Sequence, residues 1–153
     1  RRVLPGMVAR GRGAILMTSS GFGLTWMPLF SAYVGSKHYV TSFSESLRAE
    51  LSGTGVSVTQ LCPGPVATEF ESVAGNPTGQ EAPAFVELSP QDCARAGVRA
   101  LAAGRAMVIP GFFAWLGILA GVGTPRWFLR VLYGLSGRFM RKRLAAGART
   151  SAG

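Results

Sequence analysis

The stretch that decides the fold is Gly13-Ala14-Ile15-Leu16-Met17-Thr18-Ser19-Ser20-Gly21, followed by Tyr33-Val34-Gly35-Ser36-Lys37. The first part is an apolar run that breaks into small polar residues and glycine, as a buried parallel strand does at its carboxyl end. In the second part, Tyr33 and Lys37 stand four residues apart and share one face of a helix. Because an ammonium group favours the phenolate form of a nearby phenol, these two residues are a candidate proton-transfer pair. The Ser20 hydroxyl is a candidate to hold a carbonyl oxygen beside the phenol.

Strands and helices alternate over the first 110 residues. We expect strands at about 13–19, 56–62 and 106–109, and helices at about 31–52 and 89–103. This alternation predicts right-handed crossovers and a parallel sheet, which is an α/β fold.

Two further features are expected around these elements. The helix that contains Tyr33 is predicted to bury an apolar stripe of Val40, Phe43, Leu47 and Leu51. Residues 69–88 are rich in Glu, Pro and Gly and are predicted to form a loop beside the site.

The sequence from residue 3 to about residue 70 resembles the short-chain dehydrogenase/reductase family. The features in register are Leu4-Pro5-x-Met7 at a helix end, Gly13-x-Ile15 opening a strand, Ser19-Ser20, Tyr33-x-x-x-Lys37, and Pro63-Gly64 with Thr68 after the next strand. Farther along, Ser89-Pro90 is predicted to open a helix and Val108-Ile109-Pro110-Gly111 to close a strand. These two features are more weakly similar to the ketoacyl-reductase-like branch, which handles lipid substrates.

The resemblance implies a Rossmann-type doubly wound sheet and hydride transfer between a nicotinamide, NAD or NADP, and a carbonyl or alcohol. It implies that Tyr33 is the general acid, that Lys37 assists Tyr33 and binds the nicotinamide ribose, and that Ser20 orients the substrate oxygen. It also implies that the turn at Pro63 and Gly64, the backbone around Val66 and the hydroxyl of Thr68 hold the carboxamide end of the cofactor.

The family's glycine-rich dinucleotide fingerprint and its catalytic Asn would precede Arg1. We therefore expect this chain to be a carboxyl-terminal part of the family fold, with a partial dinucleotide-binding domain over 1–110 and a helical tail over 111–153. About three strands of the sheet would be present, and this chain alone would be inactive, with a homo-oligomer expected for the full-length enzyme. The alternative is a truncated non-catalytic remnant that associates with membranes or oligomerises. The choice between NAD and NADP is not readable here, because the residues around the adenosine ribose belong to the absent part.

Composition and charge limit the number of domains, the state of the cysteines and the kind of partner that the chain can bind. A chain of 153 residues is long enough for one hydrophobic core. Its two cysteines, Cys62 and Cys93, give neither a disulfide framework nor the spacing of metal ligands. We therefore expect both to be buried free thiols, as suits a reducing cytosol. Residues 1–92 hold six basic and seven acidic side chains, whereas residues 93–153 hold ten basic and none acidic. The basic charge therefore belongs to the tail.

The tail alternates arginines with large apolar side chains. That pattern favours an anionic lipid surface over nucleic acid, whose binding grooves interleave polar and stacking groups. The uncharged run from Ala106 to Pro125 has the length of a membrane span, but its prolines divide it into a strand and an apolar helix over 111–124. Three alternatives remain for the tail: a true span, a helix lying in the membrane interface, or a segment packed over the domain or a partner subunit. The expected location is the cytoplasm, at the periphery of a membrane, and the expected substrate is lipophilic.

Overall fold

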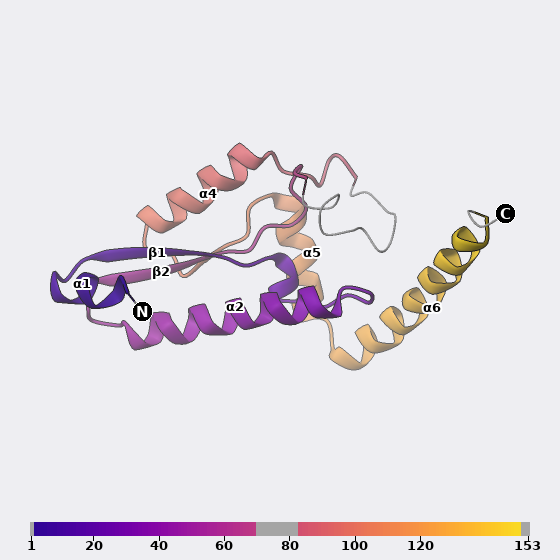
Figure 1. Cartoon of the computed structure of the whole chain (residues 1–153), viewed down its shortest axis with the longest axis horizontal. Coiled ribbons are helices and arrows are strands. Elements are labelled where there is room, and N and C mark those ends of the chain that lie inside the picture. The colour runs from indigo at the N-terminus through magenta and orange to yellow at the C-terminus, as the bar shows by residue number, and fades with distance from the viewer. Residues whose placement is uncertain (1, 70–82, 151–153) are drawn as a thin grey trace.

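The structure is a computed structural model that describes residues 2–69 and 83–150, with the side chains of 142–150 outside the description. Helices and strands alternate through most of this part of the chain (Figure 1). The elements are α1 (Leu4–Ala9), β1 (Gly13–Thr18), the short 3-10 helix η1 (Gly21–Gly23), α2 (Ser31–Glu50), β2 (Val56–Leu61), α4 (Pro90–Ala102), β3 (Met107–Val108), α5 (Phe112–Gly123) and α6 (Arg126–Thr150).

The three strands form one parallel sheet in the order β1-β2-β3. The register runs from Gly13 opposite Val56 to Thr18 opposite Leu61, so β1 and β2 end at the same edge. Helix α2 covers one face of the sheet and α4 covers the other (Figure 1). The expected α/β fold with three parallel strands is confirmed.

The core lies between α2, α1 and the sheet. Its buried residues are Leu51, Val56 and Val58, and partly buried apolar side chains from α1, β1 and α2 pack against them. On the other face, α4 approaches the sheet closely at Gly97, where a Cβ would stand 3.0 Å from Leu61 Cδ2. Small residues on α4 therefore let the helix lie flat on the strands.

The apolar stripe predicted for α2 is only partly correct. Phe43 is 44% exposed and stacks on Tyr39 with a ring-centroid distance of 6.0 Å. The buried positions of α2 are instead Thr41 and Ser44. Ser44 Oγ donates a hydrogen bond to the carbonyl of Val40, so its polar atom is satisfied within the helix. Thr41 Oγ1 lies 2.8 Å from Ser19 Oγ just after β1, so small polar side chains take the buried face of the helix.

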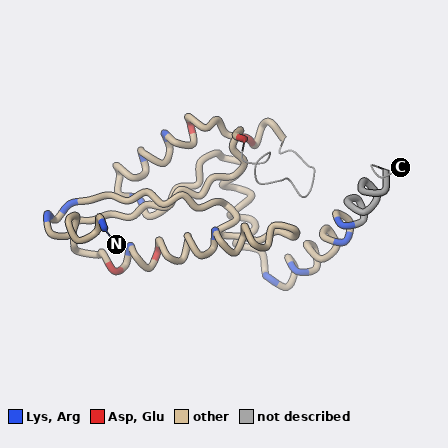
Figure 2. Tube along the Cα trace, viewed as in Figure 1, with Lys and Arg blue, Asp and Glu red and all other residues tan. Residues whose placement is uncertain are grey.

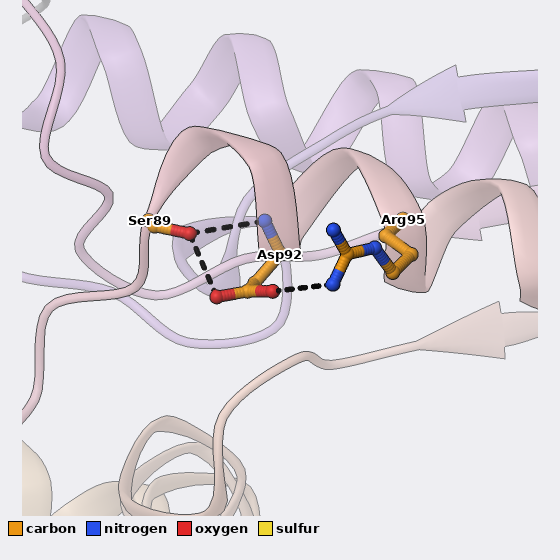
Figure 3. Close-up of polar contacts among 3 residues, drawn as sticks. All are labelled: Ser89, Asp92 and Arg95. Atoms are coloured by element: carbon orange, nitrogen blue, oxygen red, sulfur yellow. Dashed lines mark hydrogen bonds and ion pairs between the residues drawn. The ribbon is translucent and has the colours of Figure 1, made fainter.

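Helix α4 begins with a capped turn, as Ser89-Pro90 predicted. Ser89 Oγ accepts a hydrogen bond from the backbone N–H of Asp92 at 3.1 Å and donates one to Asp92 Oδ2 at 2.7 Å (Figure 3). Arg95 forms an exposed ion pair with the same carboxylate at 3.2 Å. Because the pair is exposed, it adds little stability, and the serine cap is what fixes the start of the helix.

Arg48 links two parts of the fold that the sequence pattern does not connect. Its Nη1 donates to the carbonyl of Val58 on β2 at 2.6 Å, and its Nη2 donates to the carbonyl of Gly104 after α4 at 2.9 Å. One guanidinium therefore holds α2, the central strand and the turn that leads into β3.

The tail is helical, as expected, and α6 projects away from the sheet (Figure 1). No single helix in the described residues has the length and hydropathy of a membrane span. Helix α5 and residues Arg126–Arg141 of α6 meet that criterion only as a pair, and the chain bends by 115° between them.

Candidate active site

The first candidate residue, Ser20, lies buried where β1 ends. Its Oγ accepts a hydrogen bond from the backbone N–H of Phe22 at 3.2 Å and so caps η1. The next residue, Gly21, donates its N–H to the carbonyl of Pro63 at 2.7 Å. The turn after β1 is thereby tied to the turn after β2, at the sheet edge where parallel α/β folds bind ligands.

Tyr33 and Lys37 come from the first two turns of α2. The Tyr33 ring meets the ring of Phe22 edge-on, with centroids 6.3 Å apart. Lys37 Nζ lies 5.6 Å from the centre of the Tyr33 ring and donates a hydrogen bond to the carbonyl of Thr18 at 3.3 Å. Because Phe22 also binds Ser20 through its backbone, one residue joins Ser20 and Tyr33. The structure therefore brings the three predicted residues to one place.

Ser19, which also carries a hydroxyl and directly precedes Ser20, points to a different partner. Its Oγ donates to the carbonyl of Lys37 at 3.1 Å and lies 2.8 Å from Thr41 Oγ1. These contacts attach the end of β1 to α2, whereas the side chain of Ser20 turns to η1. Ser19 is thus a residue that positions α2, and Ser20 is the candidate for the substrate.

Gly23 is not among the predicted site residues, but the structure gives it a specific role. A Cβ at this position would overlap Ser19 Oγ and Thr41 Oγ1 and would stand 2.8 Å from the carbonyl of Lys37. The backbone of η1 lies directly against the hydrogen bonds that attach α2 to β1. Only a glycine permits this approach, and the Gly21-x-Gly23 spacing is the signal in the sequence that could have indicated it.

We expect Gly23→Ala to destabilise the fold by about 1–3 kcal/mol, because the added methyl must push α2 and η1 apart. Chemical denaturation measures this effect. Gly35→Ala is the control, since Gly35 lies in α2 with nothing within 4 Å of an added Cβ. The control should be neutral or stabilising, by up to about 1 kcal/mol. Equal free energies of unfolding for the two variants would show that the close approach at Gly23 is not a constraint.

The four predicted cofactor contacts follow β2, and the structure places them separately. Pro63 binds Gly21 through its carbonyl, as described above. Gly64 lies under α5, where a Cβ would be 2.6 Å from the Cβ of Ala114. Val66 forms a parallel bridge with Leu88, and Thr68 is exposed. Residues 70–82 of the predicted loop lie outside the described residues.

Helix α5 covers this sheet edge with apolar side chains. Ile118 reaches Gly21, where a Cβ would stand 2.5 Å from Ile118 Cδ1. Phe113 meets Phe85, from the segment before α4, edge-on at 5.4 Å between centroids. The surroundings of the candidate site on this side are therefore hydrocarbon.

Cys62 lies fully buried between the strand ends, and both cysteines are free and buried as expected. Burial raises the pKa of the Cys62 thiol from 9.0 to about 11, and Glu45 adds to the rise. A hydrogen bond with Ser19 and the charge of Lys37 act in the opposite direction. The neutral thiol is thus held in the folded state.

Native Cys62 should resist alkylation by iodoacetamide at pH 9–10, because the thiolate is the reactive form. Unfolding returns the pKa of the Cys62 thiol to its ordinary value of 9.0. The unfolded chain therefore loses this proton at a lower pH than the folded chain does. The contribution of Cys62 to stability should therefore decline between about pH 9 and pH 11. Mass spectrometry of the Cys62 peptide, with and without denaturant, measures the labelling. Equal rates in both conditions would contradict the burial of this thiol.

The family model described as short chain dehydrogenase matches residues 1–77, which is half of the chain. The match lies in the amino-terminal half of this chain and does not reach the tail. It supports the family, and it does not establish the carboxyl-terminal placement expected from the missing motifs.

The curated relatives are similar over the same region. An uncharacterized oxidoreductase of Escherichia coli, YbbO, is 44% identical over 69 residues, which are 45% of this chain and 26% of the relative. The very-long-chain 3-oxoacyl-CoA reductase of Anas platyrhynchos is 36% identical over 98 residues, which are 64% of this chain and 29% of the relative. The chain thus spans less than a third of either relative.

Two solved structures share the fold. A short chain dehydrogenase from Burkholderia cenocepacia in complex with NADP has a TM-score of 0.68 and 24% identity, over 85% of this chain and 50% of that one. A short chain dehydrogenase from Mycobacterium paratuberculosis bound to NAD has a TM-score of 0.53 and 26% identity, over 71% of this chain and 47% of that one. With a family match over half its length and this fold, the chain belongs to the short-chain dehydrogenase family.

Proposed function

We propose that this chain carries the catalytic residues of an NAD(P)-dependent oxidoreductase, which transfers hydride between a nicotinamide and a carbonyl or alcohol. The observation that carries the proposal is that Ser20 and Tyr33 both contact Phe22 after β1, while Lys37 Nζ lies 5.6 Å from the centre of the Tyr33 ring. A hydroxyl, a phenol and an ammonium placed together suit the transfer of a proton to a carbonyl oxygen.

Each side chain has its own part in the proposed reaction. Tyr33 donates its phenolic proton to the substrate oxygen during reduction and accepts it back during oxidation. Lys37 stabilises the phenolate that this step leaves behind, from 5.6 Å off the Tyr33 ring. Ser20 donates a hydrogen bond to the substrate oxygen as negative charge develops there. The Ser20 hydroxyl is free to do so as a donor, because its contact with Phe22 uses it as an acceptor.

The residues at the sheet edge fit a nicotinamide cofactor. An ammonium has three N–H donors, and the structure shows the Lys37 ammonium donating to Thr18, so donors remain for ribose hydroxyls. The turn at Pro63 and Gly64, the backbone at Val66 and the hydroxyl of Thr68 would hold the carboxamide end. A bound nicotinamide supplies or accepts the hydride. The solved relatives that bind NADP or NAD leave both cofactors open.

We propose a lipophilic substrate, and two observations support it. Helix α5 covers the site edge with Ala114 and Ile118, and Phe113 and Phe85 extend this apolar cover. One relative is named as a very-long-chain 3-oxoacyl-CoA reductase. A long acyl or sterol-like substrate would keep its hydrocarbon part against α5 and its carbonyl at Ser20.

We also propose that the three strands correspond to the carboxyl-terminal half of the family's sheet, and that the full-length enzyme is a homo-oligomer. The order of Ser20, Tyr33-x-x-x-Lys37 and Pro63-Gly64 along consecutive strands and helices supports the first statement. Tyr39, 69% exposed, and Phe43 stack on the outer side of α2 and give an apolar contact for a second copy.

The test is a reductase assay of the full-length protein with NADH and with NADPH, monitored by nicotinamide absorbance. Long-chain 3-oxoacyl thioesters, keto steroids and short ketones form the substrate panel. We expect turnover with at least one long apolar carbonyl and little with the short ketones. If neither cofactor binds, the alternative of a non-catalytic remnant is favoured, and if only short ketones react, the substrate class is wrong.

A further inference from the structure

We propose that the outer surfaces of α5 and α6 form a docking face for a bilayer that contains anionic lipid. The argument starts from α5, which carries no charged residue. Ala114 and Ile118 face the domain and are buried. The large side chains of the remaining faces are 44–68% exposed, namely Phe112, Phe113, Trp115, Leu116, Leu119 and Val122. At roughly 100° per residue, these six side chains cover about 180° of the helix surface.

Helix α6 continues this surface with an amphipathic arrangement. Leu129 and Tyr133 face the domain, where Leu129 is buried and Tyr133 meets Trp26 edge-on at 4.8 Å. The exposed apolar side chains fall within about 140° of arc on the outer side. They are Trp127, Phe128, Val131, Leu132, Leu135 and Phe139. Isolated exposed apolar residues are ordinary, but twelve of them on two consecutive helices are a concentration of the kind that marks an interaction site.

The charges around this patch favour an anionic lipid surface as the occupant. Residues 93–153 contain ten basic and no acidic side chains, and Lys and Arg recur along α6 (Figure 2). In helical register, Arg130, Arg138 and Arg141 lie along or just inside one edge of the apolar arc. From there, the arginine stems can lie over hydrocarbon while the guanidinium groups reach lipid phosphates.

A bilayer fits this combination better than a protein groove. The aromatic residues Trp115 and Trp127 lie on the exposed side of each helix, where an interfacial helix places them. The 115° bend between α5 and α6 suits two helices that lie in the interface, not a straight span. A second copy of this chain would bring the same positive charge against itself, which opposes that pairing.

The experiment is flotation of the full-length protein with two kinds of vesicle, phosphatidylcholine alone and phosphatidylcholine mixed with phosphatidylglycerol. It contains no cofactor or substrate, so its outcome is independent of the proposed reaction. We expect several-fold more protein on the anionic vesicles. This excess should fall as salt rises from about 0.1 M to about 1 M, since screening shortens the range of the arginine charges.

Val131→Glu on α6 and Val98→Glu on α4 form a matched pair, because both valines are 59% exposed. Both variants add the same charge to an exposed helix position. Val131→Glu should reduce binding to anionic vesicles by about tenfold, whereas Val98→Glu should keep it within about twofold. Equal binding of the two variants, or no flotation of the wild type, would overturn the proposal.

A second readout needs no substitution. Brominated phospholipid should quench the fluorescence of Trp115 and Trp127, which lie on the proposed face, and quenching should be lost in the double variant Trp115→Phe, Trp127→Phe that keeps Trp26. A second copy of the chain would be the occupant of this face if the wild type formed a dimer and showed no quenching, and if Val131→Glu dissociated that dimer.

Discussion

Replacing Tyr33 by phenylalanine in the full-length enzyme should lower turnover by about 100-fold or more, because general acid–base catalysis contributes at least that much. The ring that packs on Phe22 is retained, so the change removes a proton and little packing. Cofactor affinity and melting temperature should therefore stay close to those of the wild type. Steady-state rates with saturating cofactor, together with thermal unfolding, separate these effects.

Tyr39→Phe is the matched control for this prediction. It removes the same hydroxyl from the same helix, at a position that is 69% exposed and six residues away from Tyr33. It should leave turnover within about twofold of the wild type, as expected for a surface substitution that removes no contact with substrate. If Tyr33→Phe retains more than about a tenth of the rate, Tyr33 is not the general acid.

Replacing Lys37 by methionine should reduce turnover by about 100-fold and also weaken cofactor binding, since one ammonium has two proposed partners. It stabilises the phenolate of Tyr33 and donates to the ribose. The loss of its hydrogen bond to the carbonyl of Thr18 should cost little stability, because that bond is exposed. Cofactor titration by nicotinamide fluorescence and steady-state kinetics measure the two losses independently.

Lys37→Arg serves as the companion variant, since it keeps the positive charge but not the shape of the ammonium. It should recover part of the cofactor affinity that Lys37→Met loses, while turnover stays low. If Lys37→Met binds the cofactor with normal affinity, Lys37 does not contact the ribose. If its turnover is normal, Lys37 does not assist proton transfer by Tyr33.

Local patterns predicted the strands and most helices well. The run from Gly13 to Thr18 ends in small polar residues because the sheet ends there, and Ser89-Pro90 predicted a capped helix start. The candidate site was also predictable, since Tyr33 and Lys37 lie on one helix and Ser20 closes the preceding strand. In these cases the residues that form the structural feature are close together in the sequence, so a local pattern is enough to predict it.

The features that were missed depend on contacts across the fold. Phe43 is exposed although it falls on the predicted apolar stripe, because Thr41 and Ser44 take the buried positions of α2, and a helical period alone does not show that choice. The constraint at Gly23 arises from Ser19 and Thr41, four and eighteen residues away. The bridge between Val66 and Leu88 joins segments on either side of a loop. Such contacts leave no periodic trace in the sequence.

The two hydrogen bonds of Arg48 also bear on the order in which the chain assembles. The bond to Val58 spans 10 residues and the bond to Gly104 spans 56. Closing the longer loop costs about 1.5 kcal/mol more conformational entropy than closing the shorter one. We therefore expect α2 and β2 to join first during folding, with the guanidinium already oriented by Val58. The turn after α4 then meets a donor that is already in place, so the docking of β3 becomes the late step of folding.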